Sequence, residues 1–70
     1  MSTSWINARI EKAMKDLDDA NSQLYFIQNK LAQPMEPRLR CWIEDNQRMA
    51  IRHKKNAELA LRRLTEQKTR

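Results

Sequence analysis

Both prolines of this 70-residue chain lie within four residues of each other, at Pro34 and Pro37, and glycine is absent. Proline and glycine are the residues that most often interrupt regular structure, so the stretches before and after the prolines can each run unbroken. Both stretches are rich in strong helix formers such as alanine, leucine, lysine and glutamine. The sequence therefore predicts one all-α domain over residues 1–70, with a helix over about 4–32, a turn over about 33–37 and a helix over about 38–66.

Apolar residues in the first stretch recur in alternating steps of four and three residues. This heptad spacing is typical of a helix that packs along one seam against another helix. The seam positions are Ile6, Ile10, Ala13, Leu17, Ala20, Leu24, Ile27 and Leu31. The spacing holds for more than three repeats, which makes it the clearest pattern in the chain.

The second stretch follows the same rhythm, with two polar members in the seam. Its positions are Leu39, Ile43, Asn46, Ala50, His53, Ala57, Ala60 and Leu64. If the chain folds back at its prolines, seam residues whose numbers add to 70 face each other across an antiparallel hairpin. Ala13 then meets Ala57, and Ala20 meets Ala50. Small residues allow two helices to approach at the short end of the usual axis separations of about 8–10 Å, so we expect a coiled-coil-like hairpin with an alanine-rich seam.

A hairpin of this size buries little apolar surface and is marginally stable alone. Cys41 is the only cysteine, which excludes an internal disulfide, and a single histidine, His53, adds little to a zinc ligand set. Self-association is the remaining means of stabilisation. Trp42 and Met49 flank the second seam and extend the apolar surface, unless they only widen the contact between the two helices. We expect two hairpins to dimerise into a four-helix bundle.

Positive charge is concentrated in the second half of the chain. Residues 36–70 carry ten basic and five acidic side chains, whereas residues 1–35 carry four of each. With Ala50 on the inner side, five basic side chains of the second helix are predicted to point outward. They are Arg48, Arg52, Lys55, Arg62 and Arg63.

The simplest interpretation of these basic residues is a solvated surface. Two pairs with i,i+4 spacing, Glu44–Arg48 and Glu58–Arg62, would neutralise part of it. One alternative is a surface that contacts the phosphates of RNA or DNA, and another is a surface that contacts an acidic protein partner or a membrane. No zinc-finger spacing and no other nucleic-acid motif accompanies the basic residues.

Several large apolar side chains lie off the seam. Trp5, Phe26 and Leu59 are predicted to point away from it. Exposed aromatic side chains anchor protein partners or stack on unpaired bases. We favour burial in an oligomer or partner interface, and the candidate interface residues are Trp5, Phe26, Trp42, Met49 and Leu59.

No combination of residues indicates catalysis. His53 and Asn46 stand in the seam, where a polar residue fixes register and oligomeric state at some cost in stability. Cys41 is twelve residues from His53, about 18 Å along a helix, which is too far for a nucleophile and its base. The acidic run at 16–19 lacks the glycine of a calcium loop. We expect no enzyme activity, no cofactor, no metal and no small-molecule substrate.

No apolar run approaches the roughly 20 residues of a membrane span, and the first residues lack the apolar core of a secretion signal. We therefore expect a cytoplasmic protein without membrane contact. The composition and the seams together favour a small, non-enzymatic interaction or regulatory protein that forms a homo-oligomer and binds another protein. An RNA- or DNA-binding regulator is the alternative. Chains of this size and kind are often accessory proteins of bacteria, plasmids or phages.

Overall fold

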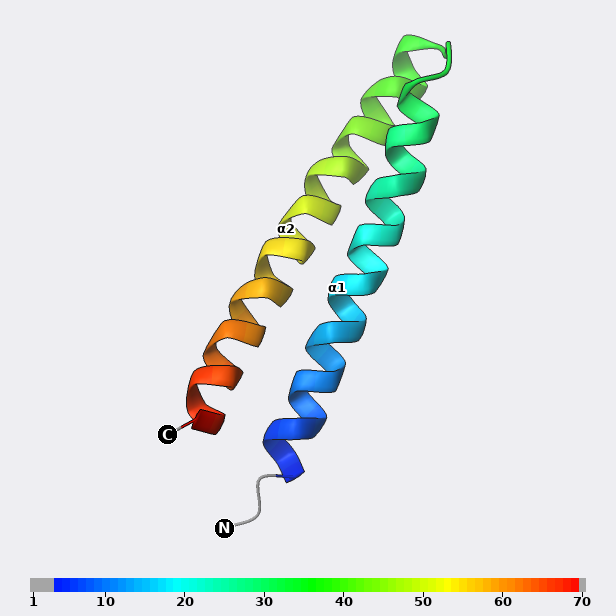
Figure 1. The fold of residues 1–70 in the computed structure, drawn as a ribbon. Helices are drawn as coiled ribbons and strands as arrows, with labels where there is room; N and C mark the ends of the chain where they lie inside the picture. Colours follow the sequence, from blue (N-terminus) through cyan, green and yellow to red (C-terminus); the bar gives the residue numbers. More distant parts are fainter. Residues whose placement is uncertain (1–3, 70) are drawn as a thin grey trace.

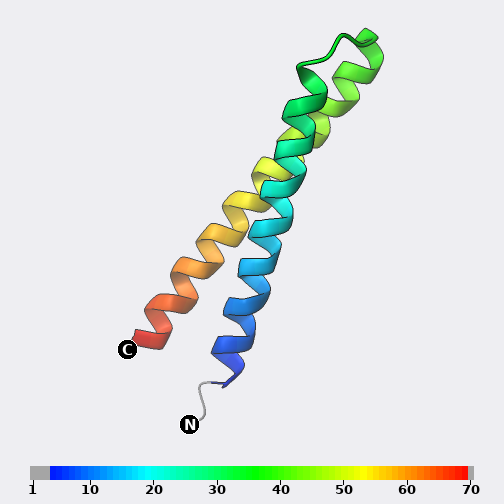
Figure 2. The same cartoon turned by 45° about the vertical axis from the view of Figure 1, so that its right-hand side comes forward.

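Two long helices make up the part of the chain that the computed structural model describes, residues 4–69. Helix α1 comprises Ser4–Leu31 and helix α2 comprises Pro37–Thr69. No strand occurs within residues 4–69. The two helices lie side by side in a rod of 55 × 13 × 13 Å, with the start of α1 and the end of α2 at the same end (Figure 1 and Figure 2). The predicted all-α fold with two helices is confirmed.

The segment between the helices reverses the chain direction (Figure 1). At its start, the amide of Ala32 donates a hydrogen bond to the carbonyl oxygen of Gln28 at 3.2 Å. Across the turn, Nη2 of Arg40 donates to the carbonyl oxygen of Leu31 at 3.4 Å. The last carbonyls of a helix have no partner within it, so α2 satisfies one of the acceptors that the end of α1 leaves free.

Helix α1 begins at the predicted position, and the other three helix boundaries differ from the predicted ones by one to three residues. Helix α1 ends at Leu31 rather than about 32, because the turn that leads to Pro34 begins there. Helix α2 begins at Pro37, a position at which the missing amide proton costs nothing. It continues to Thr69 rather than about 66, since no proline or glycine follows Pro37 to end it.

The core is one row of small side chains between the helices. Its buried residues are Ile6, Ala13, Ala20, Ile43, Ala50 and Ala57. All of them are predicted seam positions, seven residues apart within each helix, and they include both members of each predicted alanine pair. Small side chains at these positions let two helices approach toward the short end of the usual axis separations of about 8–10 Å. The alanine seam therefore permits a close approach of the helices.

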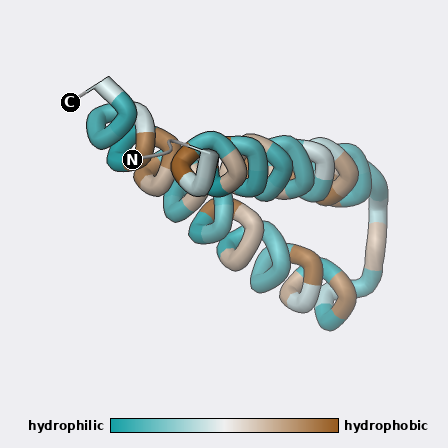
Figure 3. Tube along the Cα trace, turned by 90° about the horizontal axis from the view of Figure 1, so that it is seen from below, coloured by the Kyte–Doolittle hydropathy of each residue, from teal (hydrophilic) through white to brown (hydrophobic). Residues whose placement is uncertain are grey.

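The other half of the predicted seam is only partly covered. Its α1 members are half-buried, as is Asn46, while Leu39 and His53 are exposed. The prediction of His53 as an enclosed polar seam residue is wrong, because two helices enclose only the side chains that point directly at the partner. Trp42 and Met49 are exposed and do not widen the contact between the helices. Figure 3 shows the result: hydrophobic residues recur at intervals along two mainly hydrophilic helices.

Candidate interaction surfaces

The buried row divides the surface of the hairpin into two faces. Successive helical residues are about 100° apart, so the third residue after a buried one lies about 60° to one side and the fourth about 40° to the other. After Ala20 these residues are Gln23 and Leu24. Gln23 lines the same grooves as His53, the third residue after the buried Ala50. This side is called the groove face, and the side that carries Leu24 is called the leucine face.

An open apolar groove of about 640 Å³ lies on the groove face next to the turn. Three of the five predicted interface residues, Phe26, Trp42 and Met49, line it together. They are 68%, 64% and 58% exposed, so they form its walls without being covered themselves. The remaining apolar lining comes from Ile27, Pro34, Met35, Leu39, Ile43 and Ala50. This surface is called the aromatic groove.

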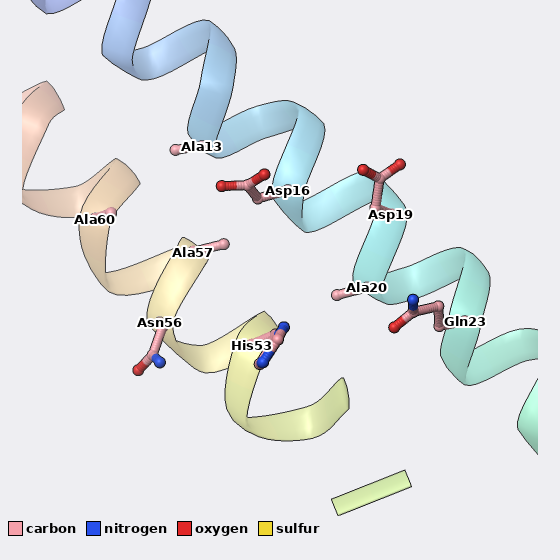
Figure 4. A pocket seen from close by; sticks show the side chains of 9 residues that line it. All are labelled: Ala13, Asp16, Asp19, Ala20, Gln23, His53, Asn56, Ala57 and Ala60. Carbon is pink, nitrogen blue, oxygen red and sulfur yellow. The ribbon is translucent and has the colours of Figure 1, made fainter. Parts of the chain in front are cut away.

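A second groove of about 530 Å³ continues along the same face toward the chain ends. It is bordered by Asp16 and Asp19 of α1 and by His53 and Asn56 of α2, with seam alanines between them (Figure 4). Within residues 4–69, no group of three or more histidine, cysteine, aspartate or glutamate side chains is placed to hold a metal ion. The groove is thus lined by polar side chains at its borders and by alanines along the seam.

A ridge of half-buried apolar side chains follows the leucine face. Its members are Ile10, Leu17, Leu24 and Leu31 of α1, with Leu61 of α2 on the same side. The more exposed Met14 and Ile51 flank the ridge. The four α1 members have the seven-residue spacing of a packing seam, yet α2 covers them only in part. A second pair of helices with the same period can cover the rest.

The other two predicted interface residues, Trp5 and Leu59, line neither groove. The guanidinium carbon of Arg9 lies 5.5 Å from the centroid of the Trp5 ring, a cation–π contact. Leu59 follows the buried Ala57 by two residues, which places it on the outer side of α2, where it is 45% exposed. The structure therefore does not combine the five predicted interface residues into one surface.

All five basic residues predicted to contact nucleic acid are exposed. The only ion pair within residues 4–69 joins Nη1 of Arg48 to Oδ1 of Asp45 at 3.2 Å. Arg48 thus pairs with Asp45, three residues away, and not with the predicted partner Glu44, four residues away; both spacings make side chains neighbours on a helix. The predicted Glu58–Arg62 pair is absent from the same part of the chain. Most of the positive charge on the outer side of α2 is therefore directed to solvent.

The chain matches no family model, no curated protein and no solved structure. In the described part of the chain, neither helix is long and apolar enough to cross a membrane. What the protein does has to be inferred from the surfaces of the hairpin itself.

The sequence predicted Phe26, Trp42 and Met49 as interface residues but did not predict that they line one groove. A signal was present in the facing positions of the two seams. Phe26 and Trp42 directly precede Ile27 and Ile43, which are the facing pair whose numbers add to 70. In an antiparallel pair, residues that precede facing positions lie on the same side, so this relation would have placed both rings on one face.

Proposed function

We propose that the protein is a small, non-enzymatic interaction and regulatory protein whose antiparallel hairpins associate in pairs and bind a further protein. The contrast between its core and its surface carries this proposal. The core of the described chain holds six side chains, four of them alanines, and none of its large side chains is fully buried. Nine large hydrophobic side chains of the described residues are exposed instead.

In a single hairpin, most large apolar side chains stay in contact with water and so contribute little to the free energy of folding. Complete burial of a leucine or phenylalanine side chain stabilises a fold by about 1.5–3 kcal/mol, whereas each alanine of the core contributes one methyl group. Ordering the backbone costs about 1–2 kcal/mol per residue. A chain with so small a core gains stability when another molecule covers its exposed apolar side chains.

The leucine face has the properties expected of a contact between two hairpins. Its ridge on α1 runs from Ile10 to Leu31, a distance of about 32 Å along the helix. A covering surface needs the same period over the same length, and a second copy of the chain offers both. A twofold axis would bring the two ridges together as the central layers of a four-helix bundle. Since Trp42 lies on the groove face, we assign self-association to the leucine face rather than to Trp42.

Sedimentation at micromolar concentration tests this assignment. We expect the wild-type chain to sediment as a dimer, and Leu24→Asp to shift it toward the monomer, because the dimer would bury a carboxylate without a partner. Ser22→Asp introduces the same charge at an exposed position on the outer side of α1 and should leave the dimer intact. A wild-type chain that stays monomeric would refute self-association, and equal behaviour of the two variants would refute the leucine face as the contact.

Nucleic-acid binding is the second candidate function, and the solvent-directed cations of α2 favour it. Arg48, Arg52, Lys55 and Arg62 follow one another in steps of four, three and seven residues along the outer side of α2. They extend over about 21 Å, which is long enough to contact several phosphates. Glu58 lies among them and Asp45 pairs with Arg48, which weakens the local positive potential and makes this the less favoured function.

Salt-dependent binding to a short duplex separates the two candidates. Changing all four cations to glutamine should weaken binding and reduce the slope of log K against log salt by about 0.9 for each phosphate that the variant no longer neutralises. The matched control changes the four basic residues of α1 to glutamine, which removes the same charge elsewhere; they are Arg9, Lys12, Lys15 and Lys30. Equal nucleic-acid affinity of the two quadruple variants would exclude a specific role of the α2 surface.

We propose that the protein is located in the cytoplasm and that it is an accessory protein of a bacterium, plasmid or phage. Cys41 is exposed and has no disulfide partner, which suits a reducing compartment. The small size and the simple two-helix architecture suit an accessory protein of a bacterium, plasmid or phage. Oxidation and multimerisation of the purified chain without reductant, reversed by thiol, would agree with this placement, whereas a Cys41 that resists oxidation would remove the reason for it.

A further inference from the structure

The aromatic groove remains open when two hairpins associate through their leucine faces, because it lies on the opposite side of the buried row. We propose that this groove binds an acidic amphipathic helix of a partner protein. The inference rests on the proposed function and specifies the partner and the surface that it contacts.

The length of the groove fits a short helix. Its lining on α2 runs from Leu39 to His53, its lining on α1 runs from Gln23 to Lys30, and the turn adds Gln33, Pro34 and Met35. The α2 side therefore extends about 21 Å, the length of a helix of about four turns. A helix laid into such a groove contacts it with apolar side chains at positions i, i+3 or i+4, and i+7.

The walls of the groove have the chemistry of a protein-binding surface. Trp42, Phe26 and Met49 are residue types enriched in the buried centres of interfaces. The Phe26 ring makes a T-shaped contact with the ring of Tyr25, with centroids 6.4 Å apart and planes at 74°. Tyr25 does not line the groove, so it supports the Phe26 ring from outside. Methionine side chains such as Met49 adapt to the shape of an incoming helix.

The charges around the groove favour carboxylates. Lys30 is the only lysine, arginine, aspartate or glutamate among the described residues that line the groove. On the α2 edge, Arg38 and Arg52 are exposed and each directly precedes a lining residue. Asp45 occupies the corresponding position between them, and its carboxylate is already paired with Arg48 at 3.2 Å. Positively charged side chains therefore lie on the α1 side of the groove, at Lys30, and beside its α2 side, at Arg38 and Arg52. This arrangement suits a bound helix with acidic residues along its flanks.

A second copy of the chain fits this groove less well than an acidic helix does. Each copy carries a net charge of +5, and the excess lies in the half that contains α2. Placing α2 of another copy in the groove would bring its arginines against Lys30, and like charges at an interface are unfavourable.

Binding to defined probes tests the proposal. The main probe is a synthetic amphipathic peptide of about four helical turns, with leucines along one face and glutamates along the other. The comparison probes are the same peptide with lysine in place of glutamate, a single-stranded RNA, and phosphatidylglycerol vesicles. We expect the acidic peptide to bind and the other three probes not to bind at the groove.

Matched variants locate the contact. Trp42→Ala and Lys30→Glu should each weaken binding of the acidic peptide about tenfold or more, as residues at the centre and charged edge of an interface do. Trp5→Ala and Lys15→Glu make the same chemical changes outside the groove and should leave the affinity unchanged. Phe26→Ala, on the other helix, should reproduce the effect of Trp42→Ala. Circular dichroism of each variant checks that the hairpin is still formed.

Equal affinity for the acidic and basic peptides would overturn the proposal, as would an acidic peptide whose binding is insensitive to both Trp42→Ala and Phe26→Ala. RNA or vesicle binding that depends on Trp42, without peptide binding, would also overturn it and assign the groove to another class of ligand. Sedimentation of Trp42→Ala separates this proposal from self-association. We expect the variant to remain dimeric, so loss of the dimer in Leu24→Asp and loss of peptide binding in Trp42→Ala are independent results.

Discussion

Replacing Ala20 by leucine tests whether the close approach of the helices is what stabilises the hairpin. Ala20 and Ala50 are each 3% exposed, in the middle of the buried row. Leucine adds three carbon atoms in the middle of a row where small residues let the helix axes approach toward the short end of the usual range of about 8–10 Å. The added atoms have to be accommodated by moving the helices apart or by a strained side-chain rotamer.

Overpacking of this kind costs about 1–3 kcal/mol. If the axes move toward a separation of about 10 Å, the neighbouring alanines Ala13 and Ala57 pack less closely as well. One kcal/mol lowers the Tm of a domain of 60–100 residues by about 4–8 °C, so we expect Ala20→Leu to lower the Tm by roughly 5–20 °C.

Thermal unfolding followed by far-UV circular dichroism measures the effect. All variants are compared at one protein concentration, because self-association makes the Tm depend on concentration. Ala8→Leu adds the same side chain at an exposed position of α1 and should change stability by less than about 0.5 kcal/mol. If Ala20→Leu melts at the same temperature as Ala8→Leu, or higher, the alanine seam does not set the approach of the helices and the assignment of inner and outer residues fails.

Two further substitutions test local contacts, with urea unfolding as the measurement. Arg40→Ala removes the hydrogen bond to the carbonyl oxygen of Leu31 and should lower the free energy of unfolding by about 0.5–1.5 kcal/mol. Arg38→Ala, at an exposed position, should lower it by less. The reverse order would show that the hydrogen bond across the turn does not stabilise the hairpin. Asp45→Asn removes an ion pair whose side chains are 75% and 70% exposed and should change stability by less than about 1 kcal/mol; a larger loss would mean that the pair is part of an interface.

Local patterns in the sequence were enough to predict two helices and the place where they are joined. Helix propensity and the absence of glycine act within a few residues, Pro34 prevents the first helix from continuing, and Pro37 fits the first turn of the second. Heptad spacing also predicted the row of buried alanines, because it is a property of each helix by itself. The end of α2 was predicted less well, since no residue after 66 marks a helix end.

Only the tertiary structure decided which half of each seam is buried and what the faces contain. His53 and Leu39 belong to the seam by spacing, yet they are exposed because the axes are rotated so that every second seam position faces the partner. The same rotation places Phe26 and Trp42 in one groove and leaves the leucine ridge on the other face. Periodicity fixes the angles between residues of one helix, but the rotation of one helix against another depends on packing between them, which no single stretch of sequence contains.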